Sequence, residues 1–304
     1  MNQQLLPPNK PERRLAEVNH DFLKTLWKWK TLNFWTIKRI SLHDRKSWSA
    51  YYVIRKLLRD GLLAEENIPK LGAVPLRLTK KSFERIAYDL GHLREKRFLP
   101  QSVPHDYLAS CFQMGNFLLK DNENVHFFTE QQIHCTEDSL LPSWVPRNRE
   151  HIPDGLTKIE YENGPKHFGI EVELHIKPVI RYGKIGFYYD HANPKFDGVF
   201  WLVESLSLME EILRLLKAAD LRRLNIHHFV LLADFKRFGW NAIVRNGFFA
   251  RKSIREAYGF SDVLGSNEIA ISDSLVSAQD FFFNSTKSPW IPMASKVLPD
   301  RHKS

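Results

Sequence analysis

Residues 170–177 read Ile-Glu-Val-Glu-Leu-His-Ile-Lys, and apolar and polar side chains alternate through all eight positions. Successive side chains of a β-strand point to opposite faces, so this alternation predicts a half-buried strand. Its polar face carries the carboxylates of Glu171 and Glu173, which stand about 6.5 Å apart because two residues of a strand cover that distance. Pro178 lacks a backbone donor and is expected to end the strand.

A second strand is predicted over residues 156–162, and the Asn-Gly pair at 163–164 is a turn signal that joins it to the glutamate strand. Such a hairpin brings Asp154 beside Glu171 and Glu173. Three carboxylates at one spot repel one another, which raises their pKa values unless a divalent cation lies among them. Hard oxygen ligands suit Mg²⁺ or Mn²⁺, so these acids are the expected metal ligands. A solvated sheet face is the alternative, and the Pro-Asp-Gly sequence around Asp154 favours the metal site.

Length and composition predict a globular protein. The chain has 304 residues, of which 43% are hydrophobic, and this is enough for two domains with separate cores. Its two cysteines, Cys111 and Cys135, lack the paired spacing of a zinc site and fit a reducing cytoplasm. The first ten residues lack the apolar core of a signal peptide, and no apolar run approaches the length of a membrane span. We therefore expect a cytoplasmic protein without membrane association.

The net charge of +9 is concentrated in the first third of the chain. Residues 1–100 hold 21 Lys and Arg against 10 Asp and Glu, a balance of +11, whereas the remaining residues hold 23 against 25, a balance of −2. A positive field confined to one part of a protein favours a polyanion such as DNA as its partner. A smaller excess of positive charge in this part of the chain would be explained by solubility alone.

The same third has the pattern of a winged helix-turn-helix domain, predicted over residues 19–98 after a flexible basic lead at 1–18. Three helices and a two-stranded wing are expected over residues 21–30, 33–40, 47–59, 62–63 and 74–78. The third helix of such a domain enters the major groove. The residues expected to contact DNA are Arg45, Lys46, Trp48, Tyr52, Arg55, Arg59 and Arg77. An ordinary helical domain with a solvated basic face is the alternative.

Residues 104–260 predict a second, α/β domain, and residues 261–304 a C-terminal extension. Helices are expected to begin at Pro104 and to cover residues 179–191 and 206–219, with apolar strands at 196–203 and 226–233. The predicted fold class is therefore α+β. Two polar residues in this part allow two interpretations each. His105 either contacts DNA or caps and packs its helix, and Glu130 is either a fourth acid of the site or a surface residue.

Pro153-Asp154 and Glu171-Val172-Glu173 resemble the PD-(D/E)XK nuclease motif, in which a Pro-Asp pair precedes an acid-x-Lys strand. The chain departs from that motif because Glu173 stands where lysine is usual, as in some restriction endonucleases of this fold. Together with the predicted winged helix, the motif resembles the MobC-type conjugative relaxases and the related replication-relaxation proteins. The resemblance covers residues 20–240 in the order of elements. It extends more loosely to the pair Lys184 and Tyr188, and to His105.

This resemblance implies metal-dependent nicking of one strand of double-stranded DNA at a plasmid origin of transfer. Asp154 and Glu171 would hold Mg²⁺ or Mn²⁺ against the scissile phosphate, and Glu173 would complete the metal shell or orient the attacking water. Lys177 or the catalytic candidate Lys184 would supply the positive charge of the missing lysine. A relaxosome accessory protein and a coupling protein are the implied protein partners.

Other functions share parts of this pattern. A plasmid replication or transcription regulator would combine the winged helix with a catalytically inactive nuclease-like domain used for dimerisation. A restriction-type enzyme would share the acids but cut both strands as a dimer. The presence of all three acids favours the nicking enzyme. Relaxase chemistry based on a histidine triad is not favoured, because the pair at 227–228 has the wrong spacing and lies in an apolar strand, and Tyr188 and Tyr189 are not assigned as nucleophiles.

Overall fold

The computed structural model describes residues 10–42, 47–114, 124–192, 194–259, 268–271, 274–277 and 282–283, and for 10–19, 47–48, 268–271 and 274–277 it describes the backbone alone. An N-terminal unit contains α1 (Lys10–Trp29), β1 (Thr31–Leu32), α2 (Phe34–Ser41), α3 (Ser47–Arg59), β2 (Leu63–Glu65), η1 (Pro69–Leu71), β3 (Leu76–Leu78) and α4 (Lys80–Ile86).

A sheet unit follows, with α5 (Val103–Met114), β4 (Val125–Thr129), α6 (Glu130–Cys135), η3 (Asp138–Leu140), β5 (Gly155–Tyr161), β6 (Gly164–Glu173), α7 (Val179–His191), β7 (Gly198–Val203), α8 (Leu206–Ala218), η4 (Leu224–Ile226), β8 (His227–Leu231), α9 (Leu232–Phe238), η5 (Gly239–Asn241) and α10 (Ile254–Ala257). The strands β9 (Glu268–Ile271) and β10 (Ser274–Ser277) then form an antiparallel pair.

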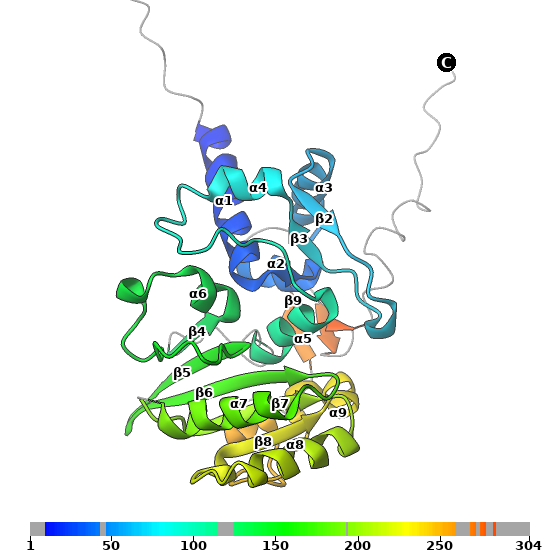
Figure 1. Ribbon diagram of the computed structural model, residues 1–304. Coiled ribbons are helices and arrows are strands. Elements are labelled where there is room, and N and C mark those ends of the chain that lie inside the picture. Colours follow the sequence, from blue (N-terminus) through cyan, green and yellow to red (C-terminus); the bar gives the residue numbers. More distant parts are fainter. Residues whose placement is uncertain are drawn as a thin grey trace, which may run out of the picture.

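In the N-terminal unit, helices pack on a small antiparallel sheet with the strand order β1-β3-β2 (Figure 1). Helix α2 begins where the sequence predicted, because the side chain of Asn33 accepts a hydrogen bond of 2.8 Å from the backbone N–H of Thr36. One face of α3 is an apolar stripe of buried side chains, Ala50, Ile54 and Leu57. One boundary differs: α1 begins at Lys10, inside the segment predicted as a flexible lead. Pro11 is compatible with this start, since the first turn of a helix tolerates proline.

The sheet unit is built on five strands in the order β4-β5-β6-β7-β8. The first three strands are antiparallel and the last three are parallel. Helices α7 and α8 cover one face of this sheet, where Trp201 and Phe229 are buried, whereas α5 and the N-terminal unit cover the other face, where Phe168 is buried (Figure 1). Helices and a mixed sheet in one chain confirm the predicted α+β class.

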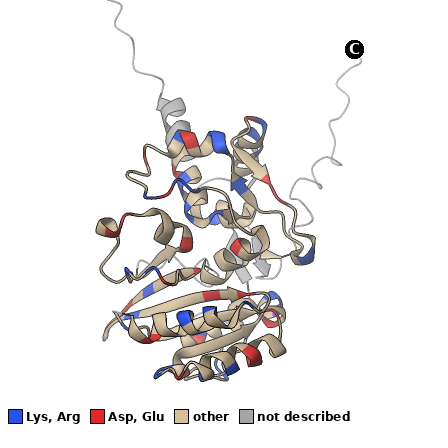
Figure 2. Cartoon of the chain, viewed as in Figure 1, with Lys and Arg blue, Asp and Glu red and all other residues tan. Residues whose placement is uncertain are grey.

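The hairpin β5–β6 forms as predicted and fixes the position of the acids. Its register sets Gly155 opposite Ile170, so Asp154 comes level with Glu171. Helix α5 packs closely on this strand, because the side chain of Gln113 donates a 2.9 Å hydrogen bond to the carbonyl of Leu156. A Cβ atom on Gly155 would lie 2.3 Å from Gln113 Oε1, so any larger residue there would displace the Gln113 amide. Figure 2 shows acidic positions on β6 near its arrowhead and on α5 above it.

Strand β6 ends at Glu173, whereas the alternation predicted that it continues to Lys177. The reason lies in the neighbouring strands: β5 begins at Gly155, opposite Ile170, and β7 ends opposite Glu173. Beyond that point no strand partner remains on either side, and a strand without ladder hydrogen bonds does not persist. Ile176, which the alternation placed in a core, is consequently 48% exposed.

The two units share one hydrophobic core. Phe22 and Leu26 of α1 belong to the same cluster of buried side chains as Tyr107 and Phe112 of α5. The predicted boundary near residue 98 therefore falls in a connecting segment, but it does not separate two independent cores. Within the described ranges, none of the helices combines the length and the apolar character that a membrane crossing requires.

Candidate functional site

Asp154 and His105 meet at the point where the hairpin ladder ends. The backbone N–H of Val172 donates a 2.6 Å hydrogen bond to Asp154 Oδ2, and its carbonyl accepts one of 3.1 Å from His105 Nε2. Both backbone groups of Val172 are thus satisfied by side chains on the β5 side of β6, because β5 pairs only as far as Ile170. His105 Nε2 also lies 3.4 Å from Asp154 Oδ2, which makes the two residues an ion pair between α5 and the residue that precedes β5.

The charges of this pair stabilise each other. The negative charge of Asp154 raises the pKa of His105 to about 11, although burial opposes the charged imidazole. Burial alone would raise the pKa of Asp154, but the charge and hydrogen bond of His105, the backbone N–H of Val172 and the charge of Lys177 together hold that pKa below its usual range. At neutral pH the site therefore contains an imidazolium beside a carboxylate. Of the two interpretations of His105, the structure supports packing within the fold, since its side chain is 21% exposed and paired with Asp154. Contact with DNA stays a prediction.

Glu171 is enclosed by donors from two other segments. Its Oε1 accepts a 2.6 Å hydrogen bond from the Tyr189 hydroxyl of α7, and His151 Nε2 lies at the same distance from it. Glu171 is only 4% exposed, so the solvated sheet face that the sequence allowed as an alternative is excluded for this residue. Neither His151 nor Tyr189 was predicted from the sequence to belong to the site. The one available signal for His151 was its position three residues before Asp154.

Glu173 is also buried and is paired with Lys177. Lys177 Nζ lies 2.8 Å from Glu173 Oε1 and forms an ion pair with it, although the angles at the two groups are not those of a hydrogen bond. Burial raises the pKa of Glu173; the ammonium of Lys177 opposes this, and the charges of Glu171 and Asp154 add to it. Lys177 also helps to hold the pKa of Asp154 low. Of the two lysines considered for the missing positive charge, Lys177 is the one that lies among the acids.

Lys184 lies elsewhere. It is exposed on α7 and lines a groove between α7 and α8 together with Ile180 and Leu215. Within the described ranges it forms no ion pair with Asp154, Glu171 or Glu173. Tyr188, one turn further along, is instead buried, and its ring contacts His151 at a centroid distance of 5.4 Å. The structure therefore does not bring Lys184 to the carboxylates.

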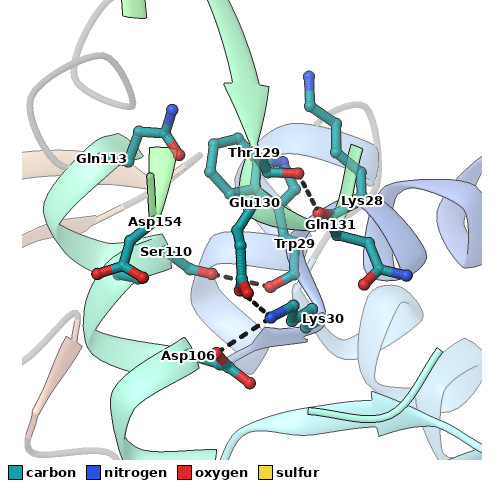
Figure 3. A pocket seen from close by; sticks show the side chains of 11 residues that line it. Lys28, Trp29, Lys30, Asp106, Ser110, Gln113, Thr129, Glu130, Gln131 and Asp154 are labelled. Atoms are coloured by element: carbon teal, nitrogen blue, oxygen red, sulfur yellow. Dashed lines mark hydrogen bonds and ion pairs between the residues drawn. The ribbon is translucent and has the colours of Figure 1, made fainter. Parts of the chain in front are cut away.

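A second charged cluster joins the N-terminal unit to this site. The ammonium of Lys30 lies between the carboxylates of Asp106 and Glu130, at 3.2 Å from Asp106 Oδ1 (Figure 3). Burial would raise the pKa of Glu130, but its hydrogen bond with His134 and the charge of Lys30 lower that pKa to about 2. The three groups and Asp154 line a cavity of about 20 Å³, room for about one water molecule. Glu130 is thus a partner of Lys30, although it lies near the acid site.

The residues predicted to contact DNA fall into three groups. Arg45 and Lys46 lie outside the described residues, as does the side chain of Trp48. Tyr52, which is 63% exposed, Arg55 and Arg59 are on the surface of α3 opposite its buried stripe. Arg77 is different, because its Nε lies 3.1 Å from Glu66 Oε2 and its charge is partly neutralised inside the small sheet.

The oxygen donors of the acids suit a hard divalent cation, but the acids do not form a complete coordination site. In the part of the chain that the structure describes, no three His, Cys, Asp or Glu side chains converge in an arrangement that could hold a metal ion. Carboxylate oxygens are nevertheless the donors that Mg²⁺ and Mn²⁺ prefer. A cation would also offset the cost of burying the negative charge of Glu173 and its repulsion by Glu171 and Asp154, both of which raise the pKa of Glu173. Metal binding therefore requires the carboxylates to exchange some of their protein donors for the ion.

Comparisons of the chain with models of protein families, with curated proteins and with solved structures find no match. Three features of the molecule bear on its function: the buried carboxylates with Lys177 and His105, the exposed face of α3, and the surface between them.

Proposed function

We propose that this protein is a DNA endonuclease that makes a divalent-metal-dependent, site-specific nick in one strand at the origin of transfer of a plasmid. The observation that carries the proposal is the gathering of Asp154, Glu171 and Glu173 around the end of β6, with Lys177 paired to Glu173 at 2.8 Å. This set contains the two strand acids, the acid of the preceding segment and a lysine. The lysine comes from the segment after the strand instead of from position 173.

In this proposal Asp154, Glu171 and Glu173 would hold Mg²⁺ or Mn²⁺, and the ion would supply neutralisation of the phosphate charge and polarisation of the P–O bond. The other residues act directly. The imidazolium of His105 and the ammonium of Lys177 place two positive charges beside a bound phosphodiester, where charge develops during cleavage. The hydroxyl of Tyr189 fixes the orientation of the Glu171 carboxylate. Each of these roles follows from a contact that already exists around the acids.

We further propose that the N-terminal unit is a winged helix-turn-helix domain that binds double-stranded DNA. The order of α1, α2 and α3, followed by the antiparallel strands β2 and β3, supports this, as do Tyr52, Arg55 and Arg59 on the exposed face of α3. A relaxosome accessory protein and a coupling protein are proposed as partners on the strength of the resemblance alone.

Nicking of a supercoiled plasmid that carries the cognate origin of transfer tests the proposal. Wild-type protein with Mn²⁺ or Mg²⁺ should produce open circles, and EDTA should abolish them. Asp154→Asn and Glu173→Gln should each lower the rate at least 100-fold, because each removes a ligand charge while keeping the shape of the side chain. Glu162→Gln is the matched control, since Glu162 is an exposed acid at the other end of the same hairpin. Nicking that survives in both site variants would place the chemistry elsewhere.

The regulator with an inactive nuclease-like domain is the second candidate, and one observation favours it. The three carboxylates are held by protein donors, and no finished metal cage exists among the described residues. Mn²⁺ titration followed by electron paramagnetic resonance separates the two functions without relying on activity. Binding that is lost in Asp154→Asn supports the nuclease. A protein that binds the origin DNA, but does not bind Mn²⁺ and does not nick the DNA, would be the regulator.

A further inference from the structure

A groove of about 1290 Å³ opens where the N-terminal unit meets the sheet unit. Its walls come from η1 and the residue pair before it, the start of α5, the segment after β6, and α9. This volume exceeds the several hundred Å³ of a typical small-molecule site, so a segment of a polymer fits it better than a metabolite does. Figure 2 shows basic positions on the loop between β2 and β3 and beside α9, on the same side of the molecule.

One end of the groove reaches the carboxylate site. Leu174 and His175, which line the groove, directly follow Glu173, and Pro104, which also lines it, directly precedes His105. A chain lying in this groove would therefore run up to the acids. The N-terminal unit and α9 are held together across the groove, because Lys236 Nζ donates a 3.2 Å hydrogen bond to the carbonyl of Lys70.

The groove combines unpaired positive charge with apolar walls. Lys70, Lys236 and Arg237 line it, and within the described residues none of the three lies within ion-pair distance of an acid; the one acid on the wall is Glu204. The rest of the lining is largely apolar, as Pro104 shows. Arg237 also lies 4.9 Å from the ring centre of Phe238, an aromatic side chain that is 38% exposed at the end of α9.

We infer that this groove binds a single strand of DNA and leads it to the carboxylate site. Phosphates need cations, whereas the faces of unpaired bases need apolar or aromatic surfaces, and the groove offers both. Duplex DNA keeps its base faces stacked inside, so the apolar walls would have nothing to contact. The inference rests on the proposed nicking function, because a nicking enzyme holds one strand at its site, and it assigns duplex recognition to α3 and strand guidance to the groove.

Fluorescence anisotropy with the full-length protein in EDTA tests the groove independently of cleavage. The probes are a labelled 20-nucleotide single strand of mixed sequence and the duplex of the same sequence. In the triple variant Lys70→Gln, Lys236→Gln and Arg237→Gln, single-strand affinity should fall at least tenfold. The slope of log affinity against log salt should shrink by about 2, since each lost phosphate contact on a single strand removes about 0.7. Duplex affinity should change less than twofold.

Two controls complete the design. Lys217→Gln removes one positive charge from the exposed end of α8, on the other face of the sheet, and should leave both affinities within twofold. Arg59→Gln on α3 should weaken duplex binding and spare the single strand. A triple variant that binds the single strand like wild type, or loses both probes equally, would overturn the inference, as would tighter binding of an RNA strand of the same sequence. If single-strand binding depends on the groove but the protein never nicks DNA, the proposed nuclease function is wrong, whereas the proposed role of the groove in binding a single strand is retained.

Discussion

Among the three acids, Glu171 is the one most completely surrounded by hydrogen-bond donors. It is 4% exposed, and its Oε1 has the Tyr189 hydroxyl and His151 Nε2 at 2.6 Å. A buried carboxylate is costly unless its oxygens accept hydrogen bonds, and bonds to charged groups are stronger than neutral ones. The hydroxyl of Tyr189 therefore contributes to the stability of the protein as well as to the orientation of the acid.

Tyr189→Phe should lower the free energy of unfolding by about 1–3 kcal/mol, because the substitution keeps the buried ring and removes one hydrogen-bond donor to the buried carboxyl group of Glu171. Urea unfolding followed by tryptophan fluorescence measures the change. Tyr188→Phe is the matched control: Tyr188 directly precedes Tyr189 on α7 and is also buried, but its ring lies edge-on to His151, and the described hydrogen bond to Glu171 comes from Tyr189. Equal losses in the two variants would mean that the hydrogen bond to Glu171 is not the cause.

The grouping of these acids was predictable at this scale, and their partners were not. Period-two alternation placed Glu171 and Glu173 on one strand, and the Asn-Gly turn placed Asp154 opposite them, because both signals act over short stretches of chain. The contacts of His105 and Tyr189 depend on which turn of α5 and α7 faces the sheet. Packing between distant segments decides that orientation, and a local pattern does not encode it. The same limit explains why Lys184 was favoured over Lys177 in the choice of catalytic residues.

At the scale of elements, the strand pair β7–β8 carries two buried histidines. The indole Nε1 of Trp201 donates a 3.0 Å hydrogen bond to His227 Nδ1, so that nitrogen must be unprotonated. Burial lowers the pKa of His227 to about 3 and that of the neighbouring His228 to about 4. As the sequence suggested, this pair lies in an apolar strand, and the structure assigns it a packing role between β7 and β8.

These depressed pKa values predict acid sensitivity. In the unfolded chain a histidine binds its proton near pH 6.5, whereas folded His227 does not until about pH 3, so the unfolded state binds more protons between these values. The contribution of each histidine to the free energy of unfolding should therefore reach its full value above pH 6.5. It should fall as the pH drops toward 3, by up to ~1.4 kcal/mol per pH unit for each histidine. Urea unfolding at a series of pH values measures the slope.

His227→Gln should make that slope shallower, because glutamine can accept the indole hydrogen bond but does not titrate. His126→Gln, on the exposed side of β4, serves as the control and should keep the slope of the wild type. A slope that is unchanged in His227→Gln would show that other groups govern the acid sensitivity of the sheet.

At the scale of the whole molecule, the junction of the two units is the feature that the sequence did not reveal. Residue ranges for most helices and strands followed from capping residues, turns and periodicity, which are local. The continuous core between α1 and α5 and the Lys30 cluster depend on which faces of the units meet. Lys30 gives no signal in the sequence, although it sits at a φ of +61°, which side chains other than glycine rarely adopt. Its buried pairing with two acids compensates for that strain.

Lys30→Met should lower the free energy of unfolding by about 3–5 kcal/mol, because it leaves Asp106 and Glu130 buried without their cation. Adding Asp106→Asn and Glu130→Gln to Lys30→Met should recover part of that loss, since the carboxylates that need the cation are then neutral. Lys24→Met on the same helix is the control; its amine lies 3.8 Å from the exposed carboxylate of Asp21, and such surface pairs contribute under ~1 kcal/mol. Urea unfolding measures all three variants. Two results would contradict this role of the charged junction: a loss of stability in Lys30→Met no larger than that in Lys24→Met, or a triple variant no more stable than Lys30→Met alone. In either case the shared apolar core must hold the two units together by itself.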